Sequence, residues 1–211
     1  MRPCVFCGAR AQYRDRMTGE HVCLEHARLA VIAAGPGEPG PCEPRPPLGI
    51  RRASPADYHW IEELALYFWD ETIVDCFERQ YDVMACPAVL ACDGDDVVGA
   101  APFAVEEAWN AVVLVMLNVL PDYQGRGGGR SLLDAVREEA KELGLARILV
   151  ATTNDDLPAL ALYQRYGFRI TEIVTGRVAE HHGSDLSGSE LSGFAGIPVR
   201  DEVRLEYQLS T

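Results

Sequence analysis

The sequence predicts an α/β (α+β) domain with a mixed, mostly antiparallel central sheet flanked by helices, preceded by a small separate module. Strand-like apolar segments alternate with amphipathic helical segments over residues 50–211. The turn Asp93-Gly94-Asp95 separates two strand-like segments, which is typical of an antiparallel hairpin. Residues 35–49 divide the chain, because ten of these 15 residues are Gly or Pro and cannot continue a helix or a sheet. We therefore expect a module at 1–34, a linker at 35–49 and the domain at 50–211.

Capping and breaking residues set the bounds of the expected elements. Ser54-Pro55 begins the first helix, since Ser caps a helix N-terminus and Pro suits its first turn. Ala111–Leu120 is almost entirely apolar, which predicts a strand buried on both faces. The expected helices are Pro55–Trp69, a short one within 71–84, one from a glycine-rich turn to Leu143, and Leu157–Tyr166. The expected strands are Ile50–Ala53, Ala88–Cys92, Val97–Val105, Ala111–Leu120, Ile148–Thr153, Arg169–Val174 and Val203–Leu209.

The charge of the chain is acidic and unevenly distributed. The chain has 19 Lys and Arg against 32 Asp and Glu, a net charge of −13. Residues 1–49 carry six Arg and five acids, whereas residues 50–211 carry 13 basic and 27 acidic residues. An acidic domain repels phosphate backbones, so nucleic acid is a poor partner for it, whereas cationic small molecules or basic peptides are attracted. The alternative is that the charge only maintains solubility.

The hydropathy pattern excludes a membrane span. No apolar run approaches the roughly 20 residues that cross a bilayer. The first residues show no apolar segment typical of a secretory signal. We expect a cytoplasmic protein that does not associate with membranes.

The N-terminal module carries metal-ligating residues at zinc-site spacing. Two Cys are separated by two residues, and 15 residues later a Cys and a His repeat this separation. The four expected ligands are Cys4, Cys7, Cys23 and His26. A module of about 34 residues cannot bury a sufficient core, so a metal would supply the missing stability. The module resembles a zinc ribbon or treble-clef finger, with structural zinc and His21 as the less favoured fourth ligand. A protein partner for this module is left open.

A glycine-rich turn, Gln124-Gly125-Arg126-Gly127-Gly128-Gly129, follows the apolar strand and begins a helix. Glycine inside a helix costs about 1 kcal/mol relative to Ala, so a run of three where a helix begins needs a reason. Glycines let the backbone approach a ligand closely, and the first amides of a helix are unpaired donors in a positive dipole field. Arg126 and Arg130 add positive charge. The turn therefore predicts a phosphate or pyrophosphate site, although it fits neither the P-loop nor the dinucleotide pattern.

The same turn fits the pattern Gln/Arg-x-x-Gly-x-Gly/Ala through Gln124, Gly127 and Gly129. With Leu117-Asn118-Val119 before it and Asn154…Leu162-Tyr163-Gln164-Arg165-Tyr166-Gly167-Phe168 after it, the domain resembles the GNAT superfamily of N-acetyltransferases. The likeness covers roughly residues 50–211. The sequence departs from the pattern at Gly128, where family members often carry an aliphatic residue.

The resemblance implies a cofactor site for acetyl-CoA. In the family, the glycine-rich loop holds the pyrophosphate, which here implies Gln124, Gly125, Arg126, Gly127, Gly128, Gly129 and Arg130. The preceding strand pairs with the pantetheine arm, which implies Leu117, Asn118 and Val119, with the Val119 amide polarising the thioester carbonyl. Asn154 matches a position that contacts pantetheine or a bound water; an N-cap for the next helix is the alternative.

The resemblance also implies the catalytic groups. Tyr163 matches the tyrosine that protonates the departing thiolate, although an ordinary core tyrosine is the alternative. The base is less determined, and Glu71, in the region that covers the acceptor, is the favoured candidate. We expect transfer of acetyl to a primary amine, of cationic character, by direct attack in a ternary complex. The alternative is a non-catalytic regulator that recruits partners through the zinc module. A longer acyl donor and a homodimer are left open.

Overall fold

The structure is a computed structural model that describes residues 13–14, 21–22, 46–178 and 193–209. The main domain holds one large sheet with the strand order β11-β12-β10-β8-β7-β6-β3, and β9 pairs with β7 off this path. All pairings are antiparallel except β8 with β10. The sheet strands are β3 (Gly49–Arg52), β6 (Ala88–Asp93), β7 (Asp96–Glu106), β8 (Ala111–Leu114), β9 (Asn118–Val119), β10 (Arg147–Thr153), β11 (Arg169–Val174) and β12 (Glu202–Gln208). The mixed, mostly antiparallel sheet is as predicted.

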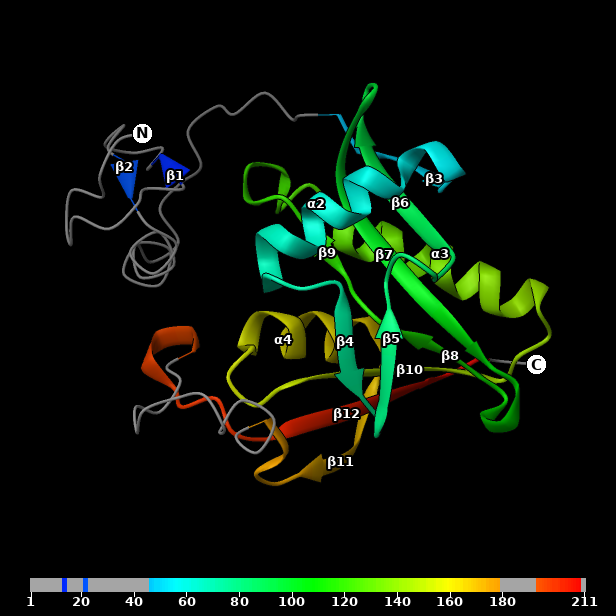
Figure 1. Cartoon of the computed structure of the whole chain (residues 1–211), viewed down its shortest axis with the longest axis vertical. Coiled ribbons are helices and arrows are strands. Elements are labelled where there is room, and N and C mark those ends of the chain that lie inside the picture. Colours follow the sequence, from blue (N-terminus) through cyan, green and yellow to red (C-terminus); the bar gives the residue numbers. More distant parts are fainter. Residues whose placement is uncertain (1–12, 15–20, 23–45, 179–192, 210–211) are drawn as a thin grey trace.

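Helices cover both faces of this sheet (Figure 1). On one face, α3 (Gly128–Glu142) and α4 (Leu157–Tyr166) pack on a core that includes Leu132, Leu133 and Phe168. On the other face, α2 (Tyr58–Trp69) contributes Ile61, Leu64 and Ala65 to a second core. The two cores place one layer of helices on each side of the sheet.

Two short strands pair in the N-terminal part of the chain. β1 (Tyr13–Arg14) and β2 (His21–Val22) pair antiparallel, with Tyr13 opposite Val22. The four predicted zinc ligands lie outside the described residues. Among the residues that are described, no cluster of three or more His, Cys, Asp or Glu could hold a metal ion.

The helix predicted within 71–84 is wrong, because this segment forms a hairpin. β4 (Ile73–Cys76) pairs antiparallel with β5 (Arg79–Asp82). The connecting residues Phe77 and Glu78 both have positive φ, 53° and 57°, as a tight primed turn requires. β-branched residues in β4 favour an extended chain, and the buried Tyr81 anchors the hairpin to the second core. The hairpin lies in front of the sheet, below α2 in Figure 1.

The single strand predicted at Ala111–Leu120 is broken into β8 and β9. β8 pairs with β10 as far as Leu114 opposite Val150, and β9 then pairs only with β7. Gly99 of β7 makes this close approach possible, because a Cβ there would lie 2.7 Å from the carbonyl oxygen of Asn118. The edge of β10 beyond Val150 is therefore separated from β9, which leaves the two strands splayed.

Three cysteines of the domain are buried as free thiols: Cys76, Cys86 and Cys92. Burial raises the pKa of Cys76 to about 12, with the nearby Glu202 and Asp75 charges adding to the effect. Burial likewise raises the pKa of Cys86 to about 11. Over the described ranges, no helix is both long and apolar enough to cross a membrane.

Candidate active site

The glycine-rich turn leaves a row of backbone amides open at the start of α3. Gly125 and Gly127 have φ of +77° and +82°, and a Cβ at either position would meet nothing within 4 Å. The helical ladder begins with the Ser131 amide, which donates to the Gly127 carbonyl at 3.0 Å. The amides of Gly128, Gly129 and Arg130 precede this bond and donate to no acceptor in the described part of the chain. Unpaired donors therefore lie at a helix N-terminus next to the open space at Gly125 and Gly127, and an anionic group is stabilised at such a terminus.

The next two glycines have a packing role instead. A Cβ on Gly128 would lie 2.8 Å from Cδ1 of Leu48, whose buried side chain fills that space. A Cβ on Gly129 would lie 3.3 Å from Leu162 and 3.6 Å from Leu117. The departure from the family pattern at Gly128 thus coincides with Leu48, which supplies the apolar contact from another segment.

The two arginines of the turn have different surroundings. Arg126 pairs with Asp93 (2.9 Å) and donates to the Pro46 carbonyl (2.6 Å), with only 9% of its side chain exposed. Its charge is therefore used to fasten the turn to β6 and to the end of the linker. Arg130 is exposed, and its guanidinium lies 5.5 Å above the Tyr166 ring. Among the described residues no carboxylate pairs with Arg130, so its charge faces the surroundings of the turn.

The splayed strand β9 directs one amide toward the gap beside β10. The Leu120 amide donates to the Val98 carbonyl at 2.8 Å, and Gly99 lies opposite Val119 in the ladder. Antiparallel ladders alternate the direction of their bonds, so the N–H and C=O of Val119 point away from β7. The Val119 carbonyl accepts from Gln124 Nε2 at 2.9 Å, which ties the strand to the turn. The Val119 amide is thus placed on the open side, as a polarising donor requires.

The neighbouring Asn118 connects β9 to α2. Its buried side-chain amide accepts from the Trp69 indole nitrogen at 2.8 Å and donates to the Leu117 carbonyl at 2.9 Å. This contact fixes the end of α2 beside the splayed strands.

Asn154 holds a loop rather than the start of α4. Its Oδ1 accepts from the Arg200 and Asp201 amides (2.8 and 2.9 Å), and its Nδ2 donates to the Pro198 carbonyl (2.9 Å). The N-cap of α4 is Asp156, whose side chain accepts from the Ala159 amide. The N-cap alternative for Asn154 is therefore wrong, and its predicted contact with a cofactor stays a prediction.

Tyr163 lies inside the core between α4 and the sheet. It is 5% exposed, and its ring centroid is 5.4 Å from that of Phe168. Burial raises its pKa, with the Asp156 charge adding to the effect, so the phenol remains protonated at neutral pH. Its hydroxyl makes no hydrogen bond within the described residues. A protonated hydroxyl without a partner suits a proton donor, and this placement also fits a core tyrosine.

A pocket of about 120 Å³ lies where α2 ends, between the hairpin and the strands β10 and β12. Glu71 is one of its lining residues, as the assignment of Glu71 to the acceptor region requires. The lining residues are Trp69, Glu71, Val74, Asp75, Thr153, Arg177, Val178 and Glu202. Trp69 joins this pocket to β9 through Asn118, so the pocket adjoins the splayed strands.

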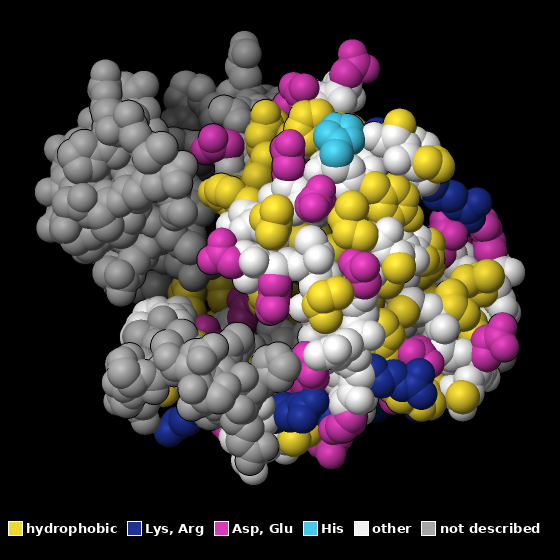
Figure 2. Space-filling view, viewed as in Figure 1, with side chains coloured by type: hydrophobic (Ala, Val, Ile, Leu, Met, Phe, Trp, Pro, Cys, Tyr) yellow, Lys and Arg dark blue, Asp and Glu magenta, His cyan; other side chains and the backbone are white. Residues whose placement is uncertain are grey.

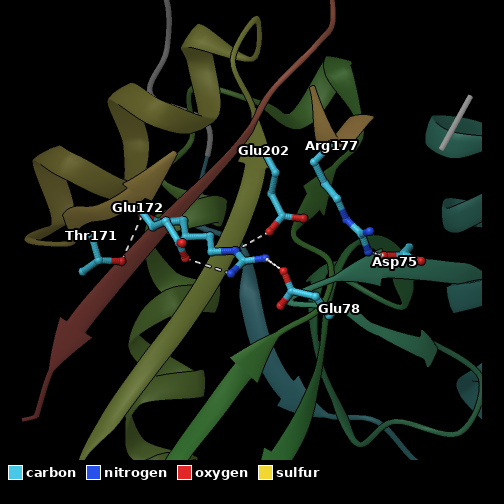
Figure 3. Close-up of polar contacts among 7 residues, drawn as sticks. Asp75, Glu78, Thr171, Glu172, Arg177 and Glu202 are labelled. Carbon is cyan, nitrogen blue, oxygen red and sulfur yellow. Dashed lines mark hydrogen bonds and ion pairs between the residues drawn. The ribbon is translucent and has the colours of Figure 1, made fainter. Parts of the chain in front are cut away.

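Ion pairs hold the hairpin against β11 and β12 beside this pocket (Figure 3). Arg177 pairs with Asp75 of β4 at 2.6 Å. Arg204 of β12 contacts three carboxylates, those of Glu202, Glu172 (2.8 Å) and Glu78. Figure 2 shows that acidic side chains predominate over basic ones on the face that carries α2 and the hairpin. The sequence interpretation missed Glu202 and Arg204, whose spacing of two residues puts them on one face of the final strand.

Comparisons with known proteins agree on one family. Residues 54–168 match the model of the acetyltransferase (GNAT) family. The chain is 34% identical over 117 residues to the uncharacterized N-acetyltransferase YvbK of Bacillus subtilis, covering 55% of this chain and 70% of that protein. It is 31% identical over 140 residues to the L-methionine sulfoximine/L-methionine sulfone acetyltransferase of Pseudomonas aeruginosa, covering 58% and 80%.

The fold agrees with a solved member that carries coenzyme A. The crystal structure of a Bacillus subtilis acetyltransferase in complex with CoA superposes with a TM-score of 0.60 at 28% identity, covering 77% of this chain and 99% of that chain. The family match, these likenesses and the splayed sheet with its open glycine-rich turn lead to the same conclusion: the chain belongs to the acetyltransferase (GNAT) family.

Proposed function

We propose that this protein is an acetyl-CoA-dependent N-acetyltransferase that transfers acetyl to a primary amine by direct attack in a ternary complex. The open row of amides at Gly128, Gly129 and Arg130 carries the proposal, because it continues through Gln124 to the outward amide of Val119. These residues fit a coenzyme whose diphosphate needs donors and whose pantetheine arm needs a free strand edge. Leu117, Asn118, Gly125, Gly127 and Asn154 would complete that site, with Arg126 fastening the turn from behind.

The proposed chemistry assigns each group one task. The amine must lose a proton before its nitrogen attacks the thioester carbonyl carbon, and Glu71 at the pocket is the proposed acceptor of that proton. The Val119 amide would stabilise the negative charge that develops on the thioester oxygen. Tyr163 would protonate the departing thiolate. After the C–N bond forms, the nitrogen loses its second proton to solvent, and Tyr163 regains a proton from solvent. Cleavage of the C–S bond then leaves the acetylated amine and free coenzyme.

The acceptor is proposed to be a small cationic amine. The pocket of about 120 Å³ takes a small group rather than a folded protein surface. The relative from Pseudomonas aeruginosa is named for small amino-acid derivatives, which supports an acceptor of similar size. The acidic surroundings of the pocket favour a positive charge on it.

The decisive experiment measures acetyl-CoA binding and thiol release with a matched pair of glycine variants. Acetyl-CoA at about 100 times its Kd should stabilise the wild type by about 2.7 kcal/mol, a rise of several degrees in Tm for a domain of this size. Gly127→Glu should abolish this rise, because its carboxylate enters the open space before the amides. Gly144→Glu is the control, since Gly144 also has positive φ (+69°) and open surroundings but lies at the far end of α3. A well-folded wild type without cofactor binding would overturn the proposal, and binding without transfer to any amine would favour the regulator.

We further propose that Cys4, Cys7, Cys23 and His26 hold a structural zinc ion in the module at 1–34. The support is the spacing of these residues in the sequence. The proposal predicts about one equivalent of zinc in protein purified without chelator.

A further inference from the structure

We propose that Glu202, which lines the pocket, binds the ammonium group of the acceptor, and that the acceptor is a small primary amine with a short apolar body. This inference rests on the proposed function and names the substrate class of the same pocket. It adds a binding residue on β12 that the sequence pattern did not indicate.

The first support is the state of the Glu202 carboxylate. Glu202 is 5% exposed, and its Oε1 accepts from Arg204 Nε. Its Oε2 accepts no hydrogen bond within the described residues. Every fully buried side-chain nitrogen or oxygen among the described residues has a partner, so Oε2 must reach accessible space. Glu202 lines the pocket, and that space is therefore the pocket itself.

The second support is the way in which Arg204 holds this carboxylate. The Arg204 side chain is 10% exposed and lies 5.1 Å from the Phe77 ring centroid. Its guanidinium is shared among Glu202, Glu172 and Glu78, and these residues converge on it from three segments in Figure 3. Glu202 is the member of this group that lines the pocket. Arg204 is thus a positioning residue that orients Glu202 toward the acceptor.

The third support is the charge around the pocket. The carboxylates of Glu71, Asp75 and Glu202 and the guanidinium of Arg177 are the charged groups that line the pocket. Three negative charges against one positive charge leave a net charge of −2 on the lining residues. The neighbouring Cys76 thiol has a raised pKa and adds no charge at neutral pH. A cation in the pocket is therefore stabilised, and an acceptor with a carboxylate is disfavoured.

The fourth support is the apolar wall. Trp69, Val74 and Val178 line the same space as the three carboxylates of Glu71, Asp75 and Glu202. A volume of about 120 Å³ is somewhat below the roughly 150 Å³ of a cavity that holds benzene. The fitting ligand has a few carbon atoms against this wall and one ammonium at Glu202.

The test measures binding of 3-methylbutylamine by calorimetry in the presence of CoA, with the alcohol 3-methylbutan-1-ol as the uncharged probe. The full-length wild type should bind the amine and bind the alcohol at least about tenfold more weakly, since a charge-assisted hydrogen bond is lost. Glu202→Gln keeps the shape and a contact to Arg204 but removes the charge, and it should weaken amine binding by about tenfold or more. Its affinity for the alcohol should not change.

Glu172→Gln is the matched control, because Glu172 also pairs with Arg204 but does not line the pocket. It should bind the amine within about twofold of the wild type. Equal losses in both variants would show that Glu202 only balances the charge of Arg204, which would overturn the proposal. Unchanged amine binding in Glu202→Gln, or no binding of the amine by wild type, would also overturn it. If the wild type neither bound acetyl-CoA nor released free thiol from it, that result would instead contradict the proposed function.

Discussion

Single side chains decide what the open turn and the pocket can do. Leu48 fills the space that a side chain at position 128 would take, so the helix start accepts a glycine without a cavity. Arg126 is fixed by Asp93, which leaves Arg130 as the exposed cation of the turn. Tyr163 differs from Tyr166 in the same helix, because the Tyr166 hydroxyl donates to Asp134 at 2.8 Å. These contrasts separate residues that make structural contacts from residues whose polar groups are available to a ligand.

Tyr163→Phe removes only the unpartnered hydroxyl. We expect kcat to fall roughly 100-fold, the usual size of a general acid contribution, whereas acetyl-CoA binding and Tm stay close to those of the wild type. Steady-state kinetics and a thermal melt check both values.

Tyr166→Phe provides the comparison for this prediction. It loses a hydrogen bond worth about 1 kcal/mol and should be less stable at nearly unchanged kcat. Wild-type kcat in Tyr163→Phe would return Tyr163 to the role of a core tyrosine.

At this scale the sequence indicates part of the site. Gln124 and the glycines of the turn are recognisable because their pattern is local, and Glu71 was placed in the acceptor region through the family resemblance. Glu202 gives no such signal, because Glu172 and Glu78, with which it shares Arg204, belong to other segments and meet it only in the folded domain. Asn is a residue type that often caps a helix N-terminus, which favours Asn154 as a cap. In the structure Asp156, two residues later, is the N-cap of α4.

Among the elements, β9 determines whether the sheet can open for a cofactor. It leaves β10 and pairs with β7 over two residues, where Gly99 allows the close approach. The hairpin of β4 and β5 closes the other side of the site and is held by Arg177 and Arg204. The strand pairing and the hairpin together give the site its two walls.

Gly99→Ala should disturb this arrangement, because its Cβ would lie 2.7 Å from the Asn118 carbonyl oxygen. We expect a loss of about 1–3 kcal/mol in the free energy of unfolding, as for other overpacked sites, together with weaker acetyl-CoA binding. Urea unfolding and calorimetry measure the two effects.

Gly49→Ala serves as the reference, since a Cβ there lies at an ordinary 3.7 Å from the Cys92 carbonyl oxygen. It should leave acetyl-CoA binding unchanged. Equal stability and cofactor affinity in both variants would show that the close approach at Gly99 does not matter.

The sequence predicts most elements, and its two errors have physical causes. Within 71–84, the turn uses Phe77 and Glu78 at positive φ without Gly or Asn, so the usual hairpin signal is missing. Over Ala111–Leu120, the apolar run continues through the break, because both parts are buried and only the partner strand changes. The hydrophobic pattern of the sequence shows which residues are buried, but it does not show which strand each buried segment pairs with.

At the scale of the whole molecule, the described part of the chain is organised around two cores that lie within the main domain. Their buried apolar residues extend from Leu48 to Leu205. The glycine-rich turn, the splayed strands and the pocket are all built on these cores. The described domain therefore contains every part of the proposed site.

A fragment of residues 46–211 should keep the Tm and the acetyl-CoA affinity of the full chain, because it retains Leu48 and the Pro46 contact of Arg126. The full chain should contain about one zinc per molecule and the fragment none. Thermal melts and elemental analysis decide both points. Zinc that stays with the fragment would contradict the assignment of the metal to the first 34 residues.

The buried thiols of Cys76 and Cys86 make detachment of the β4–β5 hairpin from the sheet measurable. A thiol whose pKa is raised to about 12 or 11 carries almost no reactive thiolate at neutral pH while the hairpin stays docked. The rate at which these two thiols are alkylated, followed by peptide mass mapping, would therefore report how often the hairpin detaches from the sheet. An acceptor bound in the pocket should lower this rate of alkylation.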